Sequence, residues 1–145
     1  MTSHTDSIIS TDRQMGFALL RVLLGFNMLG RSLVRIPEIN DFASGMAESF
    51  AETILPGSFV FIYAFVIVIA EFVIGSLLIL GWKTRWALAL MGMLMLTLTF
   101  GQVLQQNFGT LANILIYGIG VSFLLFNTRY DHFGIDRGFS VEKGE

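Results

Sequence analysis

One carboxylate in the most apolar part of the chain is the first residue whose type and position suggest chemistry. Glu71 interrupts the apolar run from Ser58 to Leu80. A helix needs about 20 apolar residues to cross a membrane. An ionised carboxylate at the centre of such a helix costs about 2.5–3.5 kcal/mol on insertion scales. We therefore expect Glu71 to be paired, protonated or turned toward a polar interior, and not to face lipid.

Arg21 is the partner that we expect for Glu71. At 1.5 Å per residue, Arg21 lies about 9 Å and Glu71 about 14 Å from the cytoplasmic ends of their predicted helices. These depths allow an ion pair, which could be bidentate. Two interpretations remain open. The pair is either a salt bridge that holds two helices together, or a catalytic pair in which Glu71 handles a proton or a ligand.

A second group of polar residues has matching depths in the other half of the predicted helices. They carry amide, phenol and guanidinium groups and are predicted to line an outward-opening pocket. The members are Asn27, Arg31, Arg35, Tyr63, Gln102, Gln106, Asn113 and Tyr117; Thr99 shares the stripe of Gln102 and Gln106, and Thr110 shares that of Asn113 and Tyr117. Such a pocket suits the carbonyl of a quinone or a small oxyanion. The alternative is ordinary hydrogen bonding between membrane helices.

Four membrane-spanning helices must position these residues. Hydropathy predicts them at about 15–36, 58–80, 85–106 and 110–126, in one membrane domain (15–126) between polar tails at 1–14 and 127–145. Pro37 ends the first helix, and the short connections make the last three antiparallel neighbours. The fold class is therefore an all-α integral membrane four-helix bundle with short loops.

The one long loop, residues 37–56, is predicted to face outward. Phe42, Met46, Phe50 and Ile54 recur every four residues in it. This spacing predicts a short amphipathic helix at the membrane surface. The alternative is a plain solvated connector.

The whole-chain composition agrees with a membrane protein. Of its 145 residues, 54% are hydrophobic and 14% are charged, whereas soluble domains have about 25% charged residues. Most basic residues fall on one side of the predicted bundle, and only Arg31 and Arg35 fall on the other. The positive-inside rule then predicts a multi-pass protein of a bacterial-type plasma (inner) membrane with both termini in the cytoplasm.

Residue types exclude several function classes. The chain has no cysteine, so it can form neither a disulfide nor an iron–sulfur cluster. Its two histidines, His4 and His132, lie in the polar tails, which argues against haem and against a multi-histidine metal site. No basic, aromatic-rich face indicates nucleic-acid binding. We expect no covalently bound cofactor, and a quinone only as a substrate.

The segments LLRVLLGFNMLGRSLVRIP, AEFVIGSLLILGWKTRWAL and RYDHFGIDRGF resemble the DoxX family of small four-helix membrane proteins. The resemblance covers roughly residues 15–137. It is most specific at Glu71, Gly75, Gly81 and Arg85. Many members have a histidine where this chain has Leu29, so a role for that histidine does not carry over.

Two functions follow as expectations. The resemblance implies a quinone-linked oxidoreductase subunit of the thiosulfate:quinone type, in which Glu71 takes the quinol proton. The alternative is a non-catalytic scaffold or assembly factor, embedded in lipid, with a membrane-protein partner or a second copy of itself. Glycines expected to allow close helix approach are Gly25, Gly30, Gly75, Gly92, Gly118 and Gly120.

Overall fold

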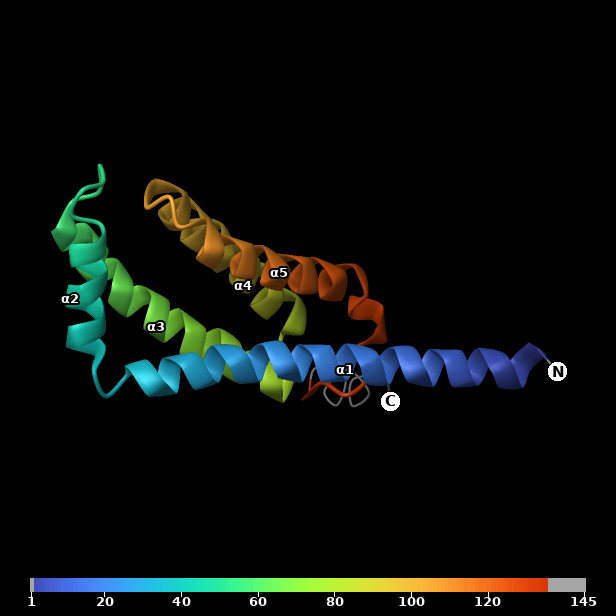
Figure 1. The fold of residues 1–145 in the computed structure, drawn as a ribbon. Coiled ribbons are helices and arrows are strands. Elements are labelled where there is room, and N and C mark those ends of the chain that lie inside the picture. Colours follow the sequence, from blue (N-terminus) through green and yellow to red (C-terminus); the bar gives the residue numbers. More distant parts are fainter. Residues whose placement is uncertain (1, 136–145) are drawn as a thin grey trace.

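The computed structural model describes residues 2–135, which form five α-helices and one short 3₁₀-helix (Figure 1). The elements are α1 (Thr2–Arg35), α2 (Ile39–Ser49), α3 (Gly57–Leu80), α4 (Thr84–Leu104), α5 (Phe108–Phe126) and η1 (Thr128–Tyr130). Four helices are long and apolar enough to cross a membrane: α1 from Ser10, α3, α4 and α5. The expected all-α four-helix membrane bundle is confirmed.

Local sequence explains the ends of α1 and α3 and the start of α5. α1 stops at Arg35, just before Pro37. Gly81 ends α3 in the left-handed conformation, with φ of 66°. The amides of Gly81 and Trp82 then bond the carbonyls of Leu78 and Leu77, which is a Schellman motif. At the start of α5, the Asn107 side chain accepts a hydrogen bond from the Thr110 amide.

The first helix is longer than expected, since it begins at Thr2 and not at about Met15. Residues 2–14 contain no proline or glycine, so nothing in the local sequence interrupts the helix. Figure 1 shows the N-terminal part of α1 extending beyond the other helices. The length of α1 thus follows from the absence of helix-breaking residues, whereas hydropathy identifies only the apolar part of the helix.

The closest helix contact joins α1 to α3 through glycines. A side chain added at Gly75 would meet the Leu29 amide nitrogen at 2.6 Å and the Gly25 carbonyl oxygen at 2.8 Å. The expected close approach at Gly25 and Gly75 is therefore confirmed. Gly30 and Gly118 have nothing within 4 Å of such an added atom, so the same expectation is wrong there.

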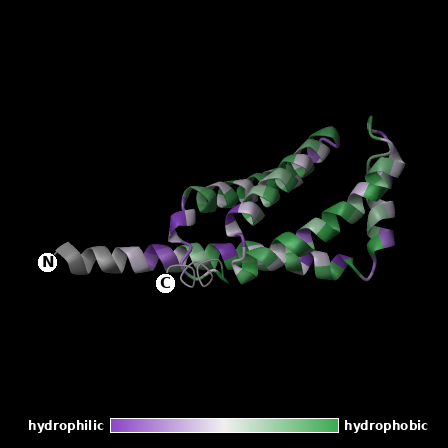
Figure 2. Cartoon of the chain, turned by 180° about the vertical axis from the view of Figure 1, so that it is seen from behind, coloured by the Kyte–Doolittle hydropathy of each residue, from purple (hydrophilic) through white to green (hydrophobic). Residues whose placement is uncertain are grey.

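Apolar side chains fill the centre and also coat the outside. The fully buried ones include Met28, Leu78, Leu88, Met91 and Leu124. Others, such as Phe26 and Ile119, are about 70% exposed. Figure 2 shows apolar residues along the long helices and hydrophilic ones gathered near the helix ends. An exposed apolar coat of this extent belongs in lipid, and the chain is a multi-pass membrane protein.

The long loop does contain the expected short helix, α2, which packs against α3 (Figure 1). Ala43 in α2 and Phe50 at its end are buried in the bundle, and the Phe50 ring faces Gly101 of α4. Ile54, expected on the same face, follows the helix and is 82% exposed. The apolar face of α2 is therefore directed into the protein and completes one wall of the bundle.

Candidate functional site

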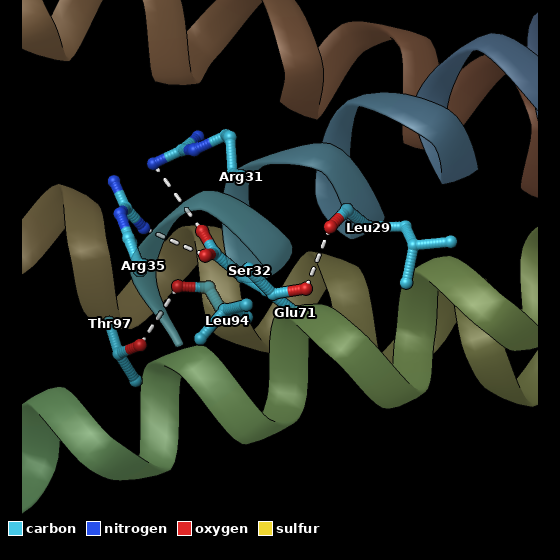
Figure 3. Close-up of polar contacts among 7 residues, drawn as sticks. All are labelled: Leu29, Arg31, Ser32, Arg35, Glu71, Leu94 and Thr97. Atoms are coloured by element: carbon cyan, nitrogen blue, oxygen red, sulfur yellow. Dashed lines mark hydrogen bonds and ion pairs between the residues drawn. The ribbon is translucent and has the colours of Figure 1, made fainter. Parts of the chain in front are cut away.

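Glu71 is fully buried on α3 and is held by two arginines of α1 (Figure 3). Arg35 donates through Nη1 to Oε2 at 2.7 Å. Arg31 Nη2 lies 3.4 Å from Oε1. The two arginines are one helical turn apart, so they share a face of α1. The carboxylate between them offsets the repulsion of two like charges at this spacing.

The expected ion pair between Arg21 and Glu71 does not form. Arg21 is 2% exposed and donates through Nη1 to Asp131 Oδ1 at 2.8 Å, beyond the end of α5. The other terminal nitrogen of Arg21, Nη2, donates to the Phe133 carbonyl oxygen at 3.4 Å. Arg21 therefore fastens the segment after η1 onto α1, and it is not part of the Glu71 site.

The glycine contact explains this change of partner. With Gly25 against Gly75, the antiparallel register places Arg21 beside Gly81, where an added side-chain atom would lie 2.1 Å from Arg21 Nη1. The same register brings Arg31 and Arg35 to Glu71. Counting depth from the helix ends missed this, because the predicted start of α1 and the end of α3 do not lie at the same level. Arg21, six residues into the predicted helix, lies beside Gly81 at the end of α3.

Next to the arginines lies a polar cavity of about 780 Å³ that is open to the surface. It is enclosed by α1, α2, α4 and α5, with one residue of α3. The expected residues that line it are Arg31, Arg35, Gln102, Asn113 and Tyr117. This volume is within the usual range of small-molecule sites. The structure brings these five residues together on the wall of one cavity.

Three expected residues lie elsewhere. Tyr63 bonds Thr97 of α4 and lines an adjoining apolar pocket of about 410 Å³, which shares Gln102 with the polar cavity. Gln106 has a positive φ of 55° in the turn between α4 and α5, and it is exposed. Asn27 lines neither cavity, and its Oδ1 is buried without a hydrogen-bond partner. The structure does not place these three residues on the wall of the polar cavity.

Several residues of the site were not expected. Asp41, Phe42 and Ser49 of α2 line the cavity, as does Gln105, just after the end of α4. Thr110 of α5, which belongs to the predicted polar stripe of that helix, lines it as well. The Arg35 guanidinium lies over the Phe42 ring, 4.5 Å from its centroid. Gln105 Nε2 donates to Ser49 Oγ at 2.8 Å, which ties α2 to α4. The four-residue spacing of Phe42 and Met46 signalled α2, but not that it forms a wall of the cavity.

The arrangement is chemically a binding site for a polar molecule. Arg31 and Arg35 keep 35% and 24% of their side-chain surface exposed, so guanidinium donors remain beyond those used on Glu71. Amide and hydroxyl groups line part of the rest, and apolar side chains such as Phe50, Ile67 and Leu98 line the remainder. Among the side chains described at residues 10–135, no group of three or more histidine, cysteine, aspartate or glutamate residues could hold a metal ion.

The fold and the site define a multi-pass integral membrane protein with a polar cavity beside a buried ion cluster. Residues 13–113, more than half of the chain, match the model of a family described as methylamine utilisation protein MauE. The chain belongs to the MauE family. No curated protein and no solved structure matches it in the corresponding comparisons.

This match corrects the expected DoxX membership, which is wrong. A buried acid and closely packed glycines serve any small helical membrane protein, so these features do not separate one such family from another. The thiosulfate:quinone activity was expected through DoxX alone. It has no support from the family that the chain does match.

Proposed function

We propose that this protein is a non-catalytic accessory protein of a membrane-bound system for methylamine utilisation. Its family description supplies the process, and the double ion pair at Glu71 supplies the role. Both carboxylate oxygens face arginines of α1, and the side chain has no exposed surface. A carboxylate held in this way supports helix registration more than proton transfer with a substrate.

The proposal includes a location and a kind of partner. The protein lies in a bacterial-type plasma membrane with both termini in the cytoplasm, which the distribution of basic residues supports. Its partner is another membrane protein of the same system. Exposed apolar side chains along all four spans leave ample surface for helix contacts within the bilayer.

Gene deletion and complementation in the organism that encodes the protein test the proposed process. The deletion strain should fail to grow with methylamine as sole nitrogen source and should grow normally with ammonium. The wild-type gene should restore growth on methylamine. Normal growth of the deletion strain on methylamine would refute the proposal.

A double substitution separates the accessory role from catalysis. Glu71→Gln with Arg35→Gln removes the carboxylate together with its nearest partner and leaves no unpaired acid. An accessory protein that still folds should complement the deletion strain, because only the registration of α1 on α3 is needed. Loss of complementation at unchanged protein abundance would instead show that the charged groups of this pair are themselves required. Immunoblots of membrane fractions measure that abundance.

A further inference from the structure

Two arginines share the single carboxylate of Glu71, so their cluster keeps one net positive charge beside the polar cavity, and one acid stands apart on the cavity wall. Arg35 and Glu71 neutralise each other at 2.7 Å. Arg31 is 3.4 Å from Glu71 and is the more exposed of the two arginines. Asp41 of α2 lines the same cavity, is exposed and forms no ion pair with the side chains described at residues 10–135. The cavity thus presents one positive and one negative group with little net charge.

This charge pattern fits one chemical class of ligand. A simple anion would be attracted by Arg31 and repelled by Asp41, and a simple amine would meet the reverse. A zwitterion satisfies both groups, because its carboxylate can accept from the Arg31 guanidinium and its ammonium can donate to Asp41. The two groups belong to different walls of the cavity, Arg31 to α1 and Asp41 to α2, which residues 36–38 connect.

The polar groups in the rest of the cavity favour a ligand with further hydrogen-bonding atoms. Gln102 lines the cavity, and its Oε1 is buried without a partner. An unsatisfied buried acceptor costs about 1–3 kcal/mol. Rotation of this amide toward the cavity would let a ligand N–H remove that cost. Asn113 and Thr110 offer additional donors and acceptors.

We infer that the cavity beside Arg31 binds a free amino acid as its zwitterion, with the carboxylate on Arg31 and the ammonium on Asp41. The cavity volume of about 780 Å³ leaves room for a side chain as well. This inference does not depend on the proposed role in methylamine utilisation. Binding can therefore fail while the growth phenotype holds, and the reverse.

Binding of radiolabelled L-glutamine to the full-length protein in nanodiscs of neutral phospholipid provides the test. L-Glutamine carries both charges and a side-chain amide. We expect saturable binding, with propionate and methylammonium competing at least about tenfold more weakly than unlabelled L-glutamine, since each lacks one of the two charge contacts. Unlabelled L-alanine, a zwitterion without the amide, should compete better than either.

Matched charge variants locate the site. Arg31→Gln and Asp41→Asn should each weaken L-glutamine binding at least about tenfold. Arg85→Gln removes an exposed cation outside the cavity, and Glu48→Gln removes an exposed acid of α2 outside the cavity; both should bind like the wild type. Thermal unfolding and gel filtration confirm that each variant is folded.

Three results would overturn the inference. One is the absence of saturable L-glutamine and L-alanine binding at millimolar concentration. Another is propionate competing as well as L-glutamine while Asp41→Asn has no effect, which would define a simple anion site. The third is normal binding by folded Arg31→Gln, which would place any amino-acid site elsewhere.

Discussion

Glu71 is the buried charge whose removal we expect to destabilise the fold through electrostatics. Replacing it by glutamine leaves Arg31 and Arg35 together in the bundle without the carboxylate that separates them. Breaking one side of a buried ion pair typically costs about 3–5 kcal/mol. Because both arginines are partly exposed, we expect Glu71→Gln to lower the free energy of unfolding by about 3 kcal/mol, at the low end of this range. Reversible unfolding in detergent measures the change.

The double variant Glu71→Gln with Arg35→Gln is the informative comparison for that loss. It removes one of the two positive charges that glutamine cannot offset and leaves only Arg31, the more exposed arginine, so it should recover most of the lost stability. Glu48→Gln, on the exposed side of α2, should be neutral. A double variant no more stable than Glu71→Gln would show that the carboxylate stabilises the fold by something other than the ion pair.

Tyr130 is the residue whose titration reports on the segment after α5. Arg13 Nη1 donates to the Tyr130 hydroxyl oxygen at 3.0 Å, and Arg129 lies over its ring. The hydrogen bond from Arg13 and the positive charge of both arginines lower the pKa of Tyr130 from its usual 10.0. The folded state favours the phenolate, so this contribution to stability is present above pH 10.0 and is lost as the pH falls through the lowered value.

Ultraviolet titration of tyrosinate can detect this shift, because the chain has only three tyrosines. The difference between wild type and Tyr130→Phe should show one tyrosine that ionises below pH 10.0. Arg13→Gln should move that transition back upward, whereas Arg85→Gln should not. A transition unaffected by Arg13→Gln would mean that the contact between α1 and η1 is not formed in solution.

At the scale of elements, the contact of α1 with α3 depends on two glycines. Gly75→Ala places a methyl group 2.6 Å from the Leu29 amide nitrogen, and that backbone atom cannot move without shifting the helix. We expect a loss of about 1–3 kcal/mol, the usual range for overpacking. Gly30→Ala, with open space around it, is the control and should be neutral or slightly stabilising. Equal unfolding curves for both variants would contradict the close packing of α1 on α3.

The sequence predicted the elements better than their register. Hydropathy is a local property, so the spans at 58–80, 85–106 and 110–126 agree with α3, α4 and α5 to within a few residues. The pairing of Arg31 and Arg35 with Glu71 depends on which backbone atoms meet at Gly25 and Gly75. Counting depth along separate helices carries no information on that contact.

Part of the cavity lining could be predicted from the sequence, and part of it could not. Arg31, Arg35, Gln102, Asn113 and Tyr117 lie on helix faces that the helical repeat already aligned. Tyr63 belongs to α3, but its hydroxyl donates a hydrogen bond to Thr97 of α4, which does not line the polar cavity. Asp41 and Ser49 come from α2, whose packing on α3 places a loop segment inside the bundle. Long-range placement of this kind is set by tertiary packing.

At the scale of the whole molecule, the cavity and the proposed topology together imply the side from which a ligand enters. Ser49, Gln105 and Thr110 line the cavity and lie at the bundle end that carries the turn between α4 and α5. With both termini in the cytoplasm, that end faces outward. We therefore expect the site to be reached from the outer, non-cytoplasmic side of the membrane.

The absence of cysteine makes this topology directly testable with single-cysteine variants, because the native chain gives no background labelling. Glu52→Cys lies in the loop after α2, and Lys83→Cys in the turn between α3 and α4; both positions are exposed. A membrane-impermeant maleimide added to intact cells should label Glu52→Cys, and should label Lys83→Cys only after the membrane is opened. The reverse pattern would place the termini outside and the cavity on the cytoplasmic side. The amino acid that we infer as its ligand would then be drawn from the cytoplasm, while the charge pairing at Arg31 and Asp41 would be unchanged.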